Sequence, residues 1–175
     1  RGGPATFTHR LRGAASATDE QFCRTMAGRF ALGFEVGRAD VRHEARRLRT
    51  SVEDAGRRLR YEFFAEAMTR LHATHVAVGH TRDDQAETVL LRLVRGAGPR
   101  GLAAMYPRHG AIVRPVLDCR RMELRAYLHE RQLTYVEDET NQDVSIPRNR
   151  VRAELIPLLA GRFNPAMVDV LAHEA

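Results

Sequence analysis

The sequence contains no lysine, so arginine supplies all 28 of its Lys+Arg side chains. A coding bias toward GC-rich codons is the simplest reason for the missing lysine, but it does not explain the net charge of +6. A positive excess is typical of proteins that bind nucleic acid, and the planar guanidinium group suits phosphate contacts and stacking on bases. The charge balance therefore favours a nucleic acid as the partner.

Cysteine is nearly absent as well. The two cysteines, Cys23 and Cys119, are isolated in the sequence and form neither a Cys-x-x-Cys pair nor a set of four metal ligands. Such spacing excludes a disulfide framework and a structural zinc site. We expect both to be packing residues that a cytoplasmic protein keeps reduced.

Long apolar runs are lacking, and no signal-peptide pattern opens the chain. A membrane-crossing helix requires roughly 20 apolar residues, and no run approaches that length. Hydrophobic residues make up 43% and charged residues 29% of the 175 residues, values that are ordinary for globular proteins. We therefore expect a soluble cytoplasmic protein with no membrane partner, built as one domain with the start of a second.

The most informative stretch runs from Gly79 to Thr88, with the sequence Gly-His-Thr-Arg-Asp-Asp-Gln-Ala-Glu-Thr. It follows an apolar, strand-like segment at 75–78 and opens a helix whose apolar residues recur every three to four positions. Ligands of open α/β sheets bind outside the carboxyl ends of the strands. Acids at a helix N-terminus also interact favourably with the helix dipole, but three acids beside a histidine and a threonine exceed what a cap requires. We interpret this turn as part of a functional site.

Strand and helix patterns alternate along the rest of the chain. Three glycines and a proline between Gly96 and Gly101 predict a loop, and Asn164 followed by Pro165 predicts the start of a last helix. Strands separated by helices are typical of a doubly wound, mainly parallel sheet. The sequence therefore predicts an α/β fold with a helical C-terminal extension. The expected helices cover 17–32, 52–67, 83–94 and 122–131, and the expected strands 34–36, 75–78, 112–117 and 134–136.

Five segments of the chain carry a resemblance to a known family. They are 9–13 (His-Arg-Leu-Arg-Gly), 51–63, 80–102 (His-x-x-Asp-Asp-Gln-x-Glu-Thr, then Arg-Gly-x-Gly-x-x-Gly-Leu), 136–141 and 146–152. In this order and spacing they resemble the tRNA(Ile)-lysidine synthetase family of PP-loop ATP pyrophosphatases. The resemblance implies a Rossmann-like PP-loop ATPase fold, with the nucleotide-binding and catalytic domain over 1–140 and a connecting loop and the start of a helical region over 141–175.

The same resemblance implies a reaction and its participants. In the family, ATP adenylates C2 of the wobble cytidine of isoleucine tRNA, and the amine of free L-lysine then displaces AMP to form lysidine. ATP with Mg²⁺ is the implied cofactor, and isoleucine tRNA and free L-lysine are the implied partners. The enzyme would thus be an ATP-dependent ligase that forms a carbon–nitrogen bond.

One family element is missing from the sequence. The family's Ser-Gly-Gly-x-Asp-Ser loop, whose amides and hydroxyls hold the pyrophosphate of ATP, should precede His9 by a strand, a helix and part of another strand. Only eight residues precede His9, and Pro4 follows the pair Gly2-Gly3. We therefore expect a truncated form without its first strand and phosphate loop, inactive on its own. The uncovered sheet edge would favour association, for example as a homodimer.

The resemblance also implies roles for single residues. Asp84 and Glu87 stand three positions apart on one face of the predicted helix, where two carboxylates can hold an ammonium group together. By resemblance they bind lysine and one of them acts as a base, while Arg60 and Arg152 lie near the nucleotide and the reacting base. No metal ligand is assigned. The other candidates are His9, Arg12, Gly79 and His80 for the nucleotide, and Arg148, Asn149 and Arg95 for the substrate or tRNA.

Some of these residues also have a purely structural interpretation. A histidine at a strand end is often simply hydrogen-bonded to backbone, so both roles stay open for His80. The family commonly has a second histidine where Thr81 stands, so no role carries over to that position. Glu137 and Asp138 are expected to cap the next turn and to order the loop that holds Arg148.

The sequence is also compatible with two other functions. A different PP-loop tRNA-modifying enzyme, such as a thiolating one, usually has a redox or cluster cysteine pair, and the two lone cysteines argue against it. A non-catalytic tRNA-binding remnant would keep the fold and the positive charge without the ATP chemistry.

Overall fold

The computed structural model describes residues 5–8 and 14–175, which fall into two compact units, 1–76 and 77–175. The nucleotide candidates His9 and Arg12 lie outside the described residues. Each unit is described by itself. The boundary expected at residues 140 and 141 stays a prediction.

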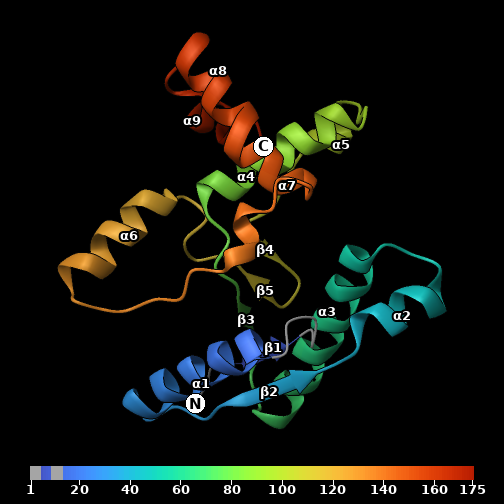
Figure 1. Cartoon of the computed structure of the whole chain (residues 1–175), viewed down its shortest axis with the longest axis vertical. Helices are drawn as coiled ribbons and strands as arrows, with labels where there is room; N and C mark the ends of the chain where they lie inside the picture. The colour runs from blue at the N-terminus through green and yellow to red at the C-terminus, as the bar shows by residue number, and fades with distance from the viewer. Residues whose placement is uncertain (1–4, 9–13) are drawn as a thin grey trace. The chain divides into compact units, whose positions relative to one another are not determined.

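The first unit joins a parallel strand pair to three helices (Figure 1). Strands β1 and β2 run parallel, with Thr6 opposite Val36. Helix α1 begins three residues before the predicted start at residue 17, and β2 confirms the strand predicted after Gly33. The elements are β1 (Ala5–Thr8), α1 (Ala14–Arg29), β2 (Glu35–Arg38), α2 (Val41–Leu48) and α3 (Val52–Arg70).

Helices α2 and α3 form a hairpin around a small core. Val41, Ala45 and Ala55 are buried there, with Leu59 packed against them. Ser51 caps α3, because its Oγ accepts a hydrogen bond from the backbone N–H of Asp54 at 3.0 Å.

The second unit holds a three-stranded sheet and most of the helical segments (Figure 1). The sheet order is β3-β5-β4, with β4 and β5 antiparallel. The elements are β3 (Val76–Ala77), α4 (Arg82–Val94), α5 (Pro99–Leu102), β4 (Arg108–His109), β5 (Ile112–Val113), α6 (Arg121–Glu130), a 3-10 turn η1 (Glu139–Gln142), α7 (Pro147–Arg150), a π-helical turn η2 (Val151–Leu155), α8 (Ile156–Arg162) and α9 (Met167–His173).

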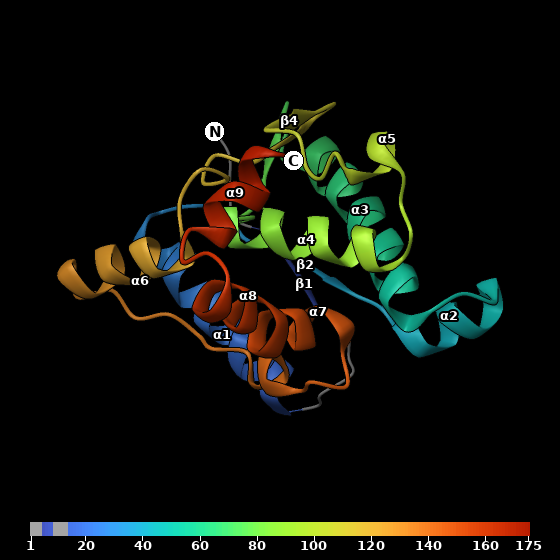
Figure 2. The same cartoon turned by 90° about the horizontal axis from the view of Figure 1, so that it is seen from above.

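Helix α4 is the central helix of this unit. Ala86, Val89 and Leu90 on α4 are buried, and so is Val168 on α9. Figures 1 and 2 both show α9 lying beside α4, and the two helices make extensive contact. The N-terminus of α4, where the candidate acids stand, is therefore carried on a packed helix.

Three local predictions need correction. Residues 134–136 form no strand but an extended connection into η1. The loop predicted for 96–101 gives way to the helical turn α5, because Pro99 stands at the first helical position, where its missing N–H costs nothing. Helix α9 begins at Met167, two residues after Pro165, although Asn164 does cap the preceding turn by accepting from the N–H of Ala166 at 2.9 Å.

The described strands and helices make an α/β fold, but they do not by themselves form a doubly wound parallel sheet. Within the described residues no single helix is long and apolar enough to cross a membrane. The segments 147–162 and 167–173 meet that test only as a pair bent by 105°.

Candidate active site

The N-terminus of α4 is fixed by reciprocal hydrogen bonds between Thr81 and Asp84. The Asp84 carboxylate accepts from the Thr81 N–H at 2.8 Å and from its hydroxyl at 2.7 Å. Thr81 Oγ1 in turn accepts from the N–H of Asp84 at 3.4 Å. This capping box holds Asp84 in one orientation at the start of the helix. Thr81, where the family commonly has a histidine, thus has a clear structural role.

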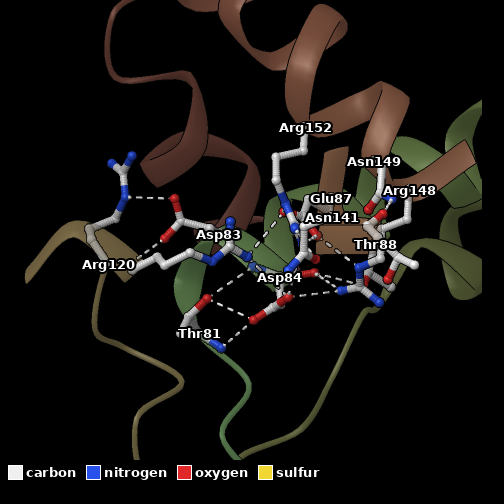
Figure 3. A network of polar contacts seen from close by, with 12 residues as sticks. Thr81, Asp83, Asp84, Glu87, Thr88, Arg120, Asn141, Arg148, Asn149 and Arg152 are labelled. Atoms are coloured by element: carbon white, nitrogen blue, oxygen red, sulfur yellow. Dashed lines mark hydrogen bonds and ion pairs between the residues drawn. The ribbon is translucent and has the colours of Figure 1, made fainter. Parts of the chain in front are cut away.

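One turn further along α4, Glu87 lies fully buried, and its carboxylate accepts hydrogen bonds from three arginines. Figure 3 labels two of them, Arg148 and Arg152. Arg152 binds it through two bonds, Nε to Oε1 at 2.6 Å and Nη2 to Oε2 at 3.0 Å. Arg148 donates Nε to Oε2 at 2.7 Å, and Arg121 donates Nη2 to Oε1 at 3.2 Å. Both carboxylate oxygens therefore accept two hydrogen bonds, which offset the cost of burying the charge.

Asp84 belongs to the same cluster. Its Oδ1 accepts from Arg121 Nη2 at 3.3 Å and from Arg148 Nη2 at 3.2 Å. Burial raises the pKa of Asp84, but the hydrogen bonds from Thr81 and the charges of Arg148 and Arg121 outweigh burial and hold the pKa below its ordinary value. Asp84 is therefore ionised at neutral pH.

Arg148 and Arg152 reach Glu87 from a helix that widens into the π-turn η2 (Val151–Leu155) just before Pro157. Pro157 has no N–H, and its ring would collide with the carbonyl four residues earlier in a regular α-helix. The backbone instead forms a π-turn, in which the N–H of Ile156 donates to the carbonyl of Val151. Arg152 stands within this turn. The hydrogen bonds that Arg152 donates to Glu87 raise the pKa of Arg152 above its ordinary value, so its positive charge is permanent.

Arg121, the first residue of α6, was not predicted as a site residue. Its side chain bridges Asp84 and Glu87 through a single nitrogen, Nη2, and its backbone N–H donates to Asp83 Oδ2 at 2.7 Å. No motif marks Arg121, since its only signal in the sequence is a positive charge before a predicted helix. Sequence reasoning could not pair a residue at 121 with acids at 84 and 87 without the fold.

A second layer of ion pairs, also missed, ties α4 to α9. Asp169 on α9 binds Arg82 Nη1 at 2.9 Å and Arg120 Nη1 at 3.2 Å. Arg120 Nε lies 3.6 Å from Asp83 Oδ1 (Figure 3). The third acid of the turn, Asp83, therefore faces α6 and the segment before it.

The remaining predicted residues are not part of the arginine cluster around Glu87. His80 accepts from Arg114 Nε at 3.2 Å through Nδ1, and Gly79 is exposed beside it. Asn149 is buried, and its amide donates to the carbonyls of Thr140 and Asp143, so it fixes the η1 segment to α7. Two further predicted site residues are also not part of this cluster. Arg95 stands at the exposed C-terminal end of α4, and Arg60 is on α3 in the first unit.

The cluster combines two carboxylates with three guanidinium groups, which leaves one positive charge in excess. The arginine side chains keep 27–31% of their surface exposed, whereas Glu87 has none. Such a site can exchange one of its cations for a ligand ammonium, or bind an anion through the outward N–H groups. Within the described residues no group of three His, Cys, Asp or Glu side chains is arranged to hold a metal ion.

Comparison with known proteins agrees with the resemblance. The chain is similar to proteins named tRNA(Ile)-lysidine synthase from Geobacter sulfurreducens (48% identity over 98% of this chain and 36% of the relative), Solibacter usitatus (44%, over 95% and 37%) and Chlorobaculum tepidum (41%, over 92% and 49%). The chain thus spans between about a third and a half of the length of these curated relatives.

A family model described as the PP-loop domain matches residues 4–159, which is most of the chain and includes Asp84, Glu87 and all three arginines of the cluster. The match extends over both units of the structure. The chain therefore belongs to the PP-loop domain family.

Proposed function

We propose that this chain is the catalytic segment of an ATP-dependent ligase that joins L-lysine to C2 of the wobble cytidine of isoleucine tRNA, forming lysidine. The relatives' name supports the reaction. The observation that carries the proposal is the pair Asp84 and Glu87, whose carboxylates are bridged by one cationic nitrogen. Two carboxylates placed in this way can hold the ammonium group of lysine between them.

The bridging nitrogen is Nη2 of Arg121, and we propose that it occupies the position of the lysine ammonium. It lies 3.3 Å from Asp84 Oδ1 and 3.2 Å from Glu87 Oε1, longer distances than the 2.6 and 2.7 Å contacts of Arg152 and Arg148 with Glu87. An ammonium is a compact point charge with three donors and can bridge two carboxylates in the same way.

Arg121 is also the arginine of the cluster that can leave most easily. It belongs to α6, a helix with no buried residue, whereas Arg148 and Arg152 are on the helical segment that includes the buried Val151. Entry of lysine would therefore exchange one cation for another on Asp84 and Glu87, with little change in the electrostatic balance.

The other candidates receive roles around this position. Before attack, the lysine amine has to lose a proton, and Asp84 or Glu87 would accept it, because arginine cannot act as a base. Arg148 and Arg152 would keep Glu87 in place and direct their remaining N–H groups toward the nucleotide or the cytidine. Asn149 would position Arg148 through the η1 segment.

The nucleotide and tRNA roles remain proposals as well. By the family resemblance, we propose His9, Arg12, Gly79 and His80 as the residues that contact ATP, with Arg60 also acting on the nucleotide. Arg95 would contact the tRNA. ATP would arrive with Mg²⁺, but no described residue is assigned to the metal. We also propose that the whole nucleotide-binding domain has a doubly wound PP-loop sheet and that the protein forms a homodimer.

The test is a chimaera in which this chain replaces the matching segment of the Geobacter sulfurreducens relative. We expect it to release AMP only when ATP, L-lysine and isoleucine tRNA are all present, and to add the mass of lysine to the wobble cytidine. The control substrate is the same tRNA with uridine at the wobble position, which should remain unmodified. A folded chimaera that binds the tRNA but forms no lysidine would favour a non-catalytic tRNA-binding role.

A further inference from the structure

Helix α2 in the first unit has one apolar face and one arginine face. Val41 and Ala45 are buried against α3, at 1% and 5% exposure. Arg42 and Arg46 stand four positions apart on α2, Arg49 is the C-terminal cap of the helix, and all three are exposed. Residues four positions apart are neighbours on a helix surface. We call these three residues, two on the helix and one at its cap, the arginine row.

Two other arginines of this hairpin are paired with acids. Arg47 binds Glu44 at 2.5 Å on α2, and Arg58 binds Glu62 at 2.8 Å on α3. The two pairs are close enough to interact, because the charge of Arg58 acts on Glu44 and that of Glu62 on Arg47. Together they form a mixed cluster with no net charge.

The arginine row lacks such ion pairs. Within the described part of the chain, none of its guanidinium groups makes a hydrogen bond or ion pair with a carboxylate. Arg46 donates Nε only to the carbonyl of Arg42, at 3.2 Å. Asp40, on which the charge of Arg46 acts, is engaged as the N-cap, where it accepts from the N–H of His43 at 2.9 Å.

A row of like charges lowers the stability of a helix unless an anion covers it. Arg49 adds to this observation. It has a positive φ of 52°, a conformation that favours glycine, yet the residue there is an arginine. Three exposed guanidinium groups in a row match the repeated charges of a nucleic-acid backbone and offer forked donors for phosphate oxygens.

We infer that the arginine row of α2 is a docking surface for the phosphate backbone of tRNA. The identification of the RNA as a tRNA rests on the proposed function. The contact itself is inferred from the arginine row, whose guanidinium groups form no ion pair with a carboxylate within the described residues. Phosphate contacts fix the position of an RNA without reading its sequence. The row should therefore strengthen binding of isoleucine tRNA and of other tRNAs alike.

The experiment compares two double variants of the 175-residue chain. Arg46→Gln with Arg49→Gly removes two charges from the row, and Arg47→Gln with Arg58→Gln removes two from the mixed cluster of the same hairpin. The net charge changes equally in both. Because glycine is favoured at position 49, the first variant should melt at the same temperature as the parent or higher, so a loss of binding would not reflect unfolding.

Filter binding of an isoleucine tRNA transcript, titrated from about 50 to 200 mM salt, supplies the readout. We expect the row variant to lose ~10-fold or more in affinity at the lowest salt, and its slope of log affinity against log salt to become shallower by about 1.4 to 1.8, as for two lost phosphate contacts. The control variant should keep the parent slope.

Equal losses in the two variants, or no loss in the row variant, would overturn the inference, because binding would then follow net charge or another surface. This outcome is separate from a failure of the proposed function. A chimaera that forms lysidine while the row variant binds normally contradicts only the docking surface. Row-dependent tRNA binding without lysidine formation contradicts only the ligase proposal.

Discussion

Glu87 and Arg152 form a bidentate ion pair in which the carboxylate is fully buried and the guanidinium group is not. The two hydrogen bonds measure 2.6 and 3.0 Å, and the Arg152 side chain keeps 27% of its surface exposed. The cost of desolvation therefore falls mainly on the acid, which is compensated by three arginines. The pair also ties α4 to the helix over 147–162, so the cluster around Glu87 serves both packing and the proposed chemistry.

The first prediction concerns stability. Glu87→Gln leaves three guanidinium groups facing a neutral amide, and we expect the free energy of unfolding of the chain to fall by about 2–4 kcal/mol. Removing one partner of a fully buried pair costs about 3–5 kcal/mol, and the partial exposure of the arginines reduces that figure. Urea denaturation followed by circular dichroism measures the change.

Glu154→Gln is the matched control for Glu87→Gln. Glu154 is exposed and has the same side chain, so its variant should lie within about 0.5 kcal/mol of the parent. Similar losses in both variants would show that the cluster adds nothing to stability beyond ordinary surface charge.

The second prediction concerns acid pH. The pKa of Asp84 is lower in the folded chain than its ordinary value of 3.8, so the folded state binds its proton less tightly than the unfolded state. This contribution to stability is fully present above the unfolded pKa and is lost as the pH falls through the folded pKa. Between about pH 5 and pH 3 the parent should lose more free energy of unfolding than Asp84→Asn.

Urea denaturation at several pH values tests this difference, with Glu130→Gln as the control for removal of an exposed acid on α6. If Asp84→Asn and the parent lose stability in parallel between those pH values, the lowered pKa of Asp84 has no thermodynamic consequence.

The sequence was sufficient to predict that the acids stand at the start of a helix, but not which side chains contact them. Local signals were enough to predict the start of α4, because Thr81, Asp84 and the apolar residues at helical spacing are all contained in a dozen residues. Arg152 and Arg148 entered through the family resemblance, and the structure brings both onto Glu87. Arg121 could not be predicted, because its contacts depend on where the connection before α6 runs.

The failures in secondary structure have similar causes. The apolar stretch 134–136 has β-forming residues but pairs with no described strand, so the local preference alone did not decide its structure. The helical turn α5 was not predicted, because its glycines and Pro99 favour a loop. Proline breaks a helix in its interior but is tolerated at its first position.

The third prediction tests the exchange at Arg121. If its Nη2 occupies the ammonium position, Arg121→Ala should bind free L-lysine more tightly than the parent, by ~10-fold, because a competing cation has been removed. Isothermal titration calorimetry on the 175-residue chain provides the measurement. Arg125→Ala is the control, since Arg125 lies one turn further along α6 and pairs with Glu137 instead.

A parent chain that binds lysine while Arg121→Ala binds it more weakly would show that Arg121 helps to hold the substrate. The exchange would then be wrong, although the two acids could still form the lysine site.

The central claim is that Asp84 and Glu87 bind the ammonium group of lysine, and steady-state kinetics of the Asp84→Asn chimaera test it most directly. Loss of one charged partner of an ammonium hydrogen bond costs about 1.5–3 kcal/mol. The KM for L-lysine should therefore rise ~10- to 100-fold, while the KM for ATP changes less than about threefold. An equal rise in both constants, or a rise in the KM for ATP alone, would contradict the assignment of these acids to lysine.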